Sequence, residues 1–420
     1  MYFSSIQITL KRLYNILTHI AAFLIKIAAL FNKKLKLGVK GRAKTFSVLK
    51  SEISDKDSVI WFHCASLGEY EQGLPVFEEI KSLNPNHKIV LSFFSPSGFE
   101  IRKNTPIADC VVYLPLDTKK NAKQFLDLVH PELVIFVKYE IWPNYLFEIK
   151  RRQVKAILIS ALFRKKQSFF KFSGKWMQKA LFTFNHIFVQ NEESKKLLEQ
   201  IDYAEVTVSG DTRFDRVSNQ LNIDNSLDFI EVFKQDKLCV VAGSTWPEGE
   251  NLLIPFINND NTNTKYVIAP HNIKSGQISN LKTKLTKATV LYSEKESVEI
   301  SNAQVFIIDT IGFLSKIYSY ADIAYVGGAI GTTGLHNTLE PAVFGVPIII
   351  GDNHEKFPEA KTMIDNNGMF SIKSQEEFNS ILNQLIQNDN FRTTSGKHNA
   401  EYISKNRGAV TSIMAYLNKR

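Results

Sequence analysis

Short apolar runs alternate with amphipathic stretches along most of this chain. Between residues 58 and 210 the amphipathic stretches, such as EQGLPVFEEIKSLN, NAKQFLDLV and ESKKLLEQI, have the spacing of helices. The apolar runs are too short for helices and are rich in Val, Ile, Leu and Phe. Continuous runs of this kind, separated by helices, predict a parallel sheet covered on both faces. The runs are SVIWFHCAS, KIVLSFF, CVVYLPL, LVIFVKY, AILISAL, HIFVQN and VTVSG.

The same alternation stops and then starts again in the second half. Residues 218–236 are mostly polar and lack a strand, and the runs KLCVVAGS, KYVIAP, ATVLYS, VFIID, IAYVGG and VPIIIGD follow. We therefore predict two doubly wound domains, with the active site in a cleft at the carboxyl ends of the strands. The last helical stretch is a candidate to pack back on the first domain. The predicted boundaries are a separate helix over 1–36, a first domain over 37–212, a linker over 213–236, a second domain over 237–391 and final helices over 392–420.

The chain starts with an apolar segment flanked by basic residues. The run from Leu13 to Phe31 is close to the minimum length that crosses a bilayer, and it contains His19 and Lys26. We therefore predict an interfacial helix rather than a membrane span. An ordinary buried first helix is the alternative. Basic residues after the run favour a cytoplasmic location for the domain that follows. These residues are Lys33, Lys34, Lys36, Lys40 and Arg42.

The composition limits the kinds of molecule and ion that the protein is expected to bind. The formal net charge is +9, with 51 basic and 42 acidic residues, which favours an anionic membrane, a phosphorylated substrate or nucleic acid. The basic residues are scattered and no nucleic-acid-binding motif is found, so we expect no nucleic acid partner. Three dispersed cysteines predict neither a disulfide framework nor a zinc site. The single Asp-x-Asp triplet, at residues 55–57, precedes the first strand, so we expect a solvated loop and no metal site.

Three charged residues of the first half follow predicted strands. Glu69 lies in HCASLGE after the first strand, and Glu140 follows LVIFVKY, so both are expected at one rim of the sheet. Two carboxylates at one rim are typical of an acid/base or orienting pair. Arg213, in GDTRFD, is placed to contact phosphate or a developing negative charge. The alternatives are carboxylates that only complement helix dipoles and a solvated hinge arginine.

Glycine-rich turns in the second half are candidates for phosphate binding. Gly243 and Ser244 follow KLCVVA, and a turn that includes Gly334 and His336 follows IAYV. Backbone N–H groups of such turns, at the start of a helix, cradle phosphate. Glu340, on the helix after the second turn, is expected to accept hydrogen bonds from ribose hydroxyls. An ordinary helix with a terminal glycine is the alternative.

Taken together, the motifs resemble those of the Kdo (3-deoxy-D-manno-octulosonic acid) transferases of lipopolysaccharide assembly. They occur in the family's order over nearly the whole chain after residue 57. The resemblance implies a GT-B glycosyltransferase that moves Kdo from CMP-Kdo to the lipid A precursor lipid IVA, at the anionic cytoplasmic face of the inner membrane. It implies no metal and no cofactor apart from the donor substrate CMP-Kdo. The motifs are HCASLGE, YEIWPN, GDTRFD, GSTWPEGE, APH, DTIG and YVGGAIGTTGLHNTLEPAVFGVP.

The resemblance also implies roles for individual residues. Glu69 matches the proton acceptor, and Glu140 and Arg213 match positions that stabilise the transition state. This chain departs from the family at His271, where arginine is usual, at Phe313, where an acidic residue is common, and at Lys138. Residues implied for the CMP site are Pro270, His271, Ile311, Gly312, Phe313, Asn337, Thr338, Leu339 and Glu340.

Two other functions fit parts of the pattern. One is a GT-B transferase or nucleotide-sugar epimerase that uses UDP in place of CMP. The other is a membrane-attached protein that binds a nucleotide sugar without turnover, although the presence of Glu69 favours an enzyme.

Overall fold

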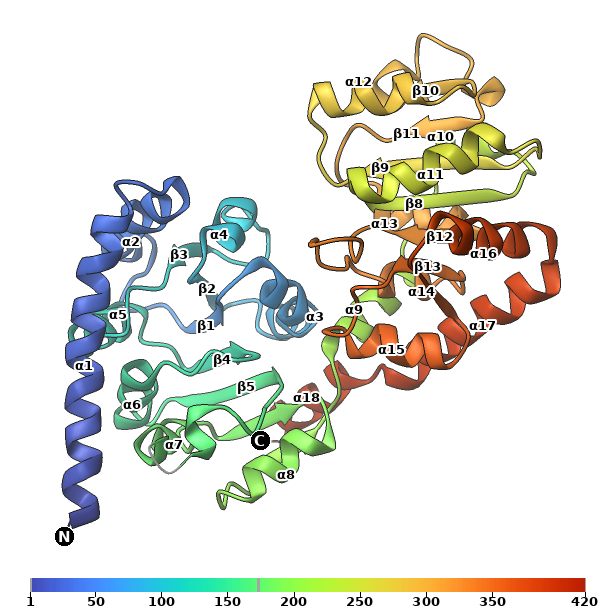
Figure 1. Cartoon of the computed structure of the whole chain (residues 1–420). Helices are drawn as coiled ribbons and strands as arrows, with labels where there is room; N and C mark the ends of the chain where they lie inside the picture. The colour runs from blue at the N-terminus through green and yellow to red at the C-terminus, as the bar shows by residue number, and fades with distance from the viewer. Residues whose placement is uncertain (1, 172–173, 420) are drawn as a thin grey trace. The chain divides into compact units, whose positions relative to one another are not determined.

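The computed structural model describes residues 2–171 and 174–419, which divide into two compact units. Unit 1 runs to Arg216 and includes the residues from Gly408 onward, and unit 2 is Val217–Arg407. Each unit contains a seven-stranded sheet in which every strand pair is parallel. The predicted pair of doubly wound α/β domains is confirmed (Figure 1).

The sheet of unit 1 has the order β3-β2-β1-β4-β5-β6-β7. The chain therefore moves outward from β1 to β3, returns to pair β4 with β1, and continues outward in the other direction. The neighbours β1 and β4 mark the point where the strand order reverses, which is where open α/β sheets bind ligands. The strands are β1 (Val59–Cys64), β2 (Lys88–Phe93), β3 (Cys110–Tyr113), β4 (Leu133–Val137), β5 (Lys155–Ala161), β6 (His186–Val189) and β7 (Val206–Val208).

Helices cover both faces of this sheet. Val59 and Trp61 of β1 join one buried cluster, to which α2, α5, α6, α7 and α8 contribute. Ile60 and Phe62 join the cluster on the opposite face, with side chains of α3 and α18. This alternation follows from the two-residue period of a strand. The helices of unit 1 are α1 (Tyr2–Ala28), α2 (Lys33–Glu52), α3 (Leu67–Leu83), α4 (Pro96–Arg102), α5 (Lys119–Val129), α6 (Pro143–Arg151), α7 (Lys175–Leu181), α8 (Glu192–Glu199), α9 (Thr212–Asn219) and α18 (Ala409–Leu417).

Helix α1 packs against the rest of unit 1 along one side only. On that side the Tyr14 hydroxyl donates to Asp117 Oδ2 at 2.6 Å, and the Tyr14 ring contacts Trp176. The other side is an exposed apolar stripe, in which Ile16 is 57% and Phe23 64% exposed. The helix is therefore not an ordinary buried first helix. Among the described residues, no helix is both long enough and apolar enough to cross a membrane. The stripe consists of Leu13, Ile16, Leu17, Ile20, Phe23, Leu24 and Ile27, and exposed Leu30 and Phe31 follow it.

The sheet of unit 2 has the order β10-β11-β9-β8-β12-β13-β14, with its reversal between β8 and β12. The sequence pattern missed the edge strand β14, because its four residues follow a glycine and form too short an apolar run to stand out. The strands are β8 (Cys239–Thr245), β9 (Lys265–Pro270), β10 (Thr289–Leu291), β11 (Val305–Ile307), β12 (Ile323–Val326), β13 (Ile348–Gly351) and β14 (Met369–Ile372).

Helices α11, α12 and α16 pack on one face of this sheet in a single buried cluster. On α10, the Phe233 ring contacts Phe306 of β11. The helices of unit 2 are α10 (Asp228–Lys234), α11 (Pro247–Asn259), α12 (Ser275–Lys284), α13 (Leu314–Ile317), α14 (Leu339–Ala342), α15 (Pro358–Asp365), α16 (Gln375–Gln387) and α17 (Asp389–Asn406). Short 3₁₀ turns are η1 (Ser168–Phe170), η3 (Gln220–Asn222), η4 (Tyr292–Glu294), η5 (Ile300–Asn302) and η6 (Tyr318–Tyr320).

The last helices are shared between the two units. Helix α17 belongs to unit 2, whereas α18 belongs to unit 1. The Asp215 carboxylate accepts hydrogen bonds from the backbone N–H groups of Gly408 and Ala409 and so holds the start of α18. Gly408 has φ of 114°, a conformation that glycine adopts without steric cost.

Candidate functional site

Two carboxylates lie at the reversal point of the sheet in unit 1. Glu69 follows β1 on the first turn of α3, and Glu140 follows β4. Because β1 and β4 pair in parallel, with His63 opposite Phe136, their carboxyl ends meet at one edge. The negative charge of Glu140 contributes to raising the pKa of Glu69. The predicted common rim is therefore observed.

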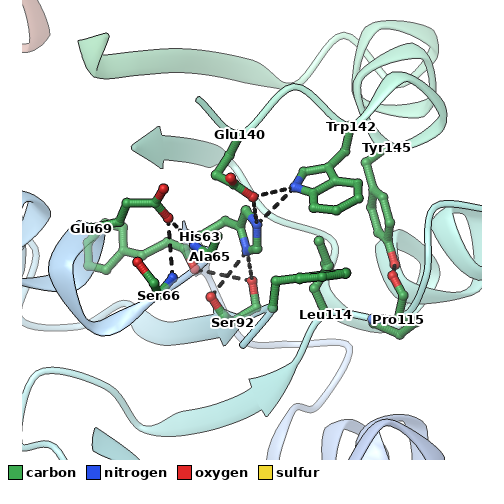
Figure 2. Close-up of polar contacts among 12 residues, drawn as sticks. His63, Ala65, Ser66, Glu69, Ser92, Leu114, Pro115, Glu140, Trp142 and Tyr145 are labelled. Carbon is green, nitrogen blue, oxygen red and sulfur yellow. Dashed lines mark hydrogen bonds and ion pairs between the residues drawn. The ribbon is translucent and has the colours of Figure 1, made fainter. Parts of the chain in front are cut away.

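Glu69 is held by the turn between β1 and α3. Its Oε2 accepts from the backbone N–H of Ala65 and, at 3.2 Å, from that of Ser66 (Figure 2). This is a capping box, in which the third helical residue reaches back to the N-cap Ser66. Burial and the negative charge of Glu140 raise the pKa of Glu69 to about 7, against the opposing effect of these N–H groups and Lys138. A carboxylate of this pKa accepts a proton effectively near neutral pH.

Glu140 is buried beside two side chains that also contact each other, because the Trp142 indole Nε1 lies 3.1 Å from His63 Nε2. The Trp142 indole Nε1 donates to Oε2 at 2.7 Å, and His63 Nε2 lies 3.1 Å from the same oxygen (Figure 2). On its other side the His63 ring contacts Ser92, with Nδ1 at 2.8 Å from Oγ and 3.1 Å from the carbonyl oxygen. Ser92 Oγ also accepts from the Trp61 indole at 2.7 Å. A continuous buried network thus runs from Trp61 to Glu140.

A buried carboxylate stabilises the chain just after Glu140, where α6 begins. Helix α6 starts at Pro143, and its first N–H groups lack helical partners. The buried Asp117 carboxylate accepts from the backbone N–H of Asn144 and Tyr145, each at 3.1 Å. Tyr14 of α1 donates to the same carboxylate. The N-terminal helix is therefore connected to the start of α6 through one buried side chain.

Arg213 is positioned by Asp211. Its guanidinium Nε and backbone N–H donate to the Asp211 carboxylate at 2.9 and 3.0 Å, and Gln72 of α3 donates to the same carboxylate. Burial raises the pKa of Asp211, but the Arg213 charge and these hydrogen bonds outweigh it and lower the pKa overall. The Tyr139 phenol interacts electrostatically with Arg164, Glu69 and Arg213. Gln72 therefore links Asp211 and Arg213 to α3, the helix that carries Glu69.

The predicted residues of unit 2 follow neighbouring strands of its sheet. Gly243 and Ser244 are among the last residues of β8. They are not at the start of a helix, as the sequence suggested, because α11 begins only at Pro247. A Cβ on Gly243 would lie 1.9 Å from the Tyr318 hydroxyl, so this position requires glycine. The loop after β12 passes close to β8, where a Cβ on Gly327 would lie 2.0 Å from the Ser244 carbonyl oxygen.

Three flat side chains stack at the carboxyl ends of β8, β9 and β12. Trp246 and His271 stack with ring centroids 4.6 Å apart, and His271 lies 4.5 Å from His336. The Trp246 indole donates to His336 Nε2 at 2.8 Å. Burial and then His271 lower the pKa of His336 to about 4, and burial lowers the pKa of His271. Both imidazoles are therefore neutral at pH 7 and offer hydrogen bonds in place of the charge of an arginine.

The remaining candidates form two groups. Asn337 donates to Glu340 Oε1 at 2.9 Å, and its own Oδ1 accepts from the backbone N–H of Leu339. Thr338 and Leu339 are buried, and Gly334 is exposed in the loop before them.

The second group lies after β11. Gly312 has φ of 103°, Ile311 is 79% exposed, and Phe313 packs against Phe229 and Tyr292. Phe313 thus replaces an expected acidic residue with a ring held in an aromatic cluster.

Pro270 is the last residue of β9, directly before His271. In the described parts of the chain, no cluster of three or more His, Cys, Asp or Glu side chains is arranged to hold a metal ion.

Sequence reasoning gave no role to His63, Ser92 or Trp246. One signal was available for His63, a polar residue inside a strand whose six residues are all buried. Ser92 and Trp246 gave no such signal, because their partners are 29 and 90 residues away.

Comparison with known proteins finds relatives of one kind. Residues 38–216 match the family profile described as 3-deoxy-D-manno-octulosonic-acid transferase (kdotransferase). The chain is 27% identical over 346 residues to a 3-deoxy-D-manno-octulosonic acid transferase of Aquifex aeolicus, covering 80% of this chain and 88% of that protein. The enzyme of the same name from Haemophilus influenzae is 25% identical, covering 85% and 86%.

Solved structures add the fold. The UDP-GlcNAc 2-epimerase of Neisseria meningitidis superposes with a TM-score of 0.60 at 15% identity, covering 86% of this chain and all of that one. A putative UDP-N-acetylglucosamine 2-epimerase of Listeria monocytogenes gives 0.56 at 11% identity, covering 86% and 96%. With these matches, the chain is similar in sequence to 3-deoxy-D-manno-octulosonic-acid transferases over most of its length, and it is a glycosyltransferase of the GT-B fold.

Proposed function

We propose that this protein transfers Kdo from CMP-Kdo to a hydroxyl group of the lipid A precursor lipid IVA, with inversion at the anomeric carbon and without a metal ion. The observation that carries the proposal is Glu69. It stands at the reversal point of the sheet, beside Glu140, with a pKa raised to about 7. Such a carboxylate suits the removal of a proton from an alcohol as that alcohol attacks.

In the proposed reaction Glu69 accepts the proton of the acceptor hydroxyl. The hydroxyl oxygen attacks the anomeric carbon from the face opposite CMP and forms the new glycosidic bond. The bond from that carbon to the phosphate oxygen breaks, and its electron pair leaves with CMP. Arg213, held by Asp211, is proposed to stabilise the negative charge that develops, as preorganised charges do in other transfer reactions.

The donor is proposed to bind unit 2. The turns after β8 and β12 approach each other at Gly243 and Gly327, where added side chains would clash, and the phosphate is proposed to bind the backbone of these turns. His271 and His336 are uncharged near neutral pH and can donate hydrogen bonds. Glu340 is proposed to accept from the ribose hydroxyls, with Asn337 orienting its carboxylate.

The acceptor is proposed to be reached at an anionic membrane surface, the cytoplasmic face of the inner membrane. The exposed stripe of α1 supports this, because seven large apolar side chains on one side of a helix otherwise face water. Lys33, Lys34 and Lys36 follow the stripe and suit anionic head groups. An interfacial helix of this kind holds the protein against the layer that contains its lipid substrate.

Mass spectrometry tests the proposal directly. The full-length protein is incubated with CMP-Kdo and a tetraacylated lipid A precursor, and the lipid is then extracted. We expect the lipid mass to increase by one or more Kdo residues and CMP to be released. Parallel reactions contain UDP-N-acetylglucosamine in place of CMP-Kdo, or the Glu69→Gln variant. The proposal is wrong if the lipid is unchanged with CMP-Kdo while the UDP-sugar is consumed.

A further inference from the structure

The buried histidine of β1 is unusual for its position. His63 is fully buried in a strand whose other residues are Val, Ile, Trp, Phe and Cys. Burying an imidazole is costly unless both of its nitrogens find partners. Here both do: Nδ1 meets Ser92, and Nε2 meets the Glu140 carboxylate at 3.1 Å. The histidine therefore has a polar partner on each side.

The donors and acceptors of this network determine where the hydrogens lie. The Trp61 indole can only donate, so Ser92 Oγ accepts from it at 2.7 Å. The Ser92 hydroxyl hydrogen then points to His63 Nδ1 at 2.8 Å, because the other acceptor, the Phe62 carbonyl oxygen, is 3.4 Å away. Nδ1 then accepts, which puts the ring hydrogen on Nε2. The Trp142 indole Nε1 also lies 3.1 Å from His63 Nε2, but we assign its hydrogen to the nearer and charged acceptor, Glu140 Oε2, at 2.7 Å.

A protonated imidazole leads to the same arrangement at Glu140. Its Nδ1–H would donate to the Ser92 carbonyl oxygen at 3.1 Å, and its Nε2–H would still face Glu140. The Trp142 indole donates to the same carboxylate oxygen at 2.7 Å. Two donors that converge on one oxygen fix the orientation of the carboxylate.

We infer that His63 is a positioning residue of the transfer reaction, which holds the Glu140 carboxylate through Nε2–H and is itself held by Ser92 and Trp61. The inference rests on the proposed function of the Glu69 and Glu140 site. His63 acts only through Glu140 and need not touch a substrate. Loss of its hydrogen bond leaves Trp142 as the remaining donor of the pair and lets the carboxylate rotate.

The charge of Glu140 matters to Glu69, which gives His63 an indirect influence on the proton acceptor. Burial and the Glu140 charge raise the Glu69 pKa, while Lys138 and the N–H groups of Ala65 and Ser66 lower it. A displaced Glu140 changes this balance. We therefore expect a defect in the chemical step rather than in donor binding.

Kinetics of two His63 variants test the inference. The His63→Gln side chain can still present an N–H group to Glu140, whereas His63→Leu has the bulk but no donor. We expect His63→Leu to lower kcat about 10- to 100-fold, with the KM for CMP-Kdo changed less than about twofold, as for loss of a hydrogen bond to a charged group. His63→Gln should recover most of that loss.

A matched control is available on the same sheet. His186 is also buried in a strand of unit 1, where its Nε2 contacts the Thr207 hydroxyl at 2.9 Å, away from the carboxylate pair. His186→Gln should leave kcat within about twofold of the wild type. The inference is wrong if His63→Leu keeps wild-type kcat. It is equally wrong if Gln and Leu at position 63 lower kcat alike.

Nuclear magnetic resonance gives a measurement that does not depend on turnover. In protein labelled with ¹⁵N-histidine, we expect His63 to show a slowly exchanging Nε2–H proton. Its resonance should move in Glu140→Gln, because an amide oxygen is a weaker acceptor, while that of His186 stays in place. No coupling between His63 and Glu140 would overturn the inference even in an active enzyme. Observed coupling in a wild-type protein that transfers no Kdo would instead contradict the proposed function.

Discussion

Replacing Glu69 with glutamine should abolish sugar transfer and, at the same time, stabilise the fold. Glutamine keeps an oxygen that can accept from the Ala65 and Ser66 N–H groups, so the capping box survives. It cannot take the acceptor proton. Loss of a general base typically lowers the rate about 10²- to 10⁴-fold.

The gain in stability follows from the raised pKa. A rise from 4.5 to about 7 corresponds to about 3 kcal/mol of free energy that disfavours the ionised form in the folded protein. Above pH 7 the carboxyl group is ionised in both the folded and the unfolded state, so the folded state carries the whole penalty. Below pH 4.5 the group is protonated in both states, and the penalty disappears.

Urea unfolding at two pH values measures this effect. We expect Glu69→Gln to exceed the wild type in free energy of unfolding by about 3 kcal/mol at pH 8 and by less than about 1 kcal/mol at pH 5. The control is Glu79→Gln, an exposed position on the same helix, which should change stability little at either pH. Equal stability of Glu69→Gln and the wild type at pH 8 would refute the burial argument. Near-wild-type turnover by this variant would remove Glu69 from the mechanism.

The remaining predictions concern the pH profile, the nucleotide, the metal and the N-terminal helix. The pH profile of kcat/KM should fall below about pH 7, since protonated Glu69 cannot accept a proton, and a profile flat down to pH 5 would contradict this. Glu340→Ala should weaken CMP binding about tenfold or more in calorimetry, as the loss of a charge-assisted hydrogen bond does, whereas unchanged affinity would exclude Glu340 from the nucleotide site. Transfer should persist in excess EDTA, and inactivation that magnesium reverses would show a metal requirement. Leu17→Glu combined with Phe23→Glu, both on the exposed stripe, should release the protein from vesicles and slow transfer to lipid in membranes but not in detergent. Removal of residues 1–36 should likewise release the protein from vesicles and slow transfer to lipid in membranes. This truncation also removes the hydrogen bond from Tyr14 to Asp117. A truncated protein that is unstable and inactive in detergent would therefore show that α1 is part of the fold of unit 1.

Much of the architecture was present in the local pattern of the sequence. The continuous apolar runs and the helices between them predicted two parallel sheets, because a strand buried on both faces has no polar side. The same pattern placed Glu69 and Glu140 directly after strands, and parallel strands end at a common edge. The apolar run at the start of the chain, flanked by basic residues, also predicted an interfacial helix, because the run is close to the minimum length that crosses a bilayer.

Strand order was decided only in the tertiary structure. β1 and β4 are separated by two other strands along the chain, and only their pairing brings His63 to Glu140. The raised pKa of Glu69 depends on the same pairing, because burial and a neighbouring charge arise from residues that are distant in the sequence. The group of Trp246, His271 and His336 assembles in the same way from the segments that follow three separate strands. Periodicity reports what each segment must bury, but the contacts between segments are set by the packing of the whole sheet, and these contacts determine the hydrogen bonds and charges of the site.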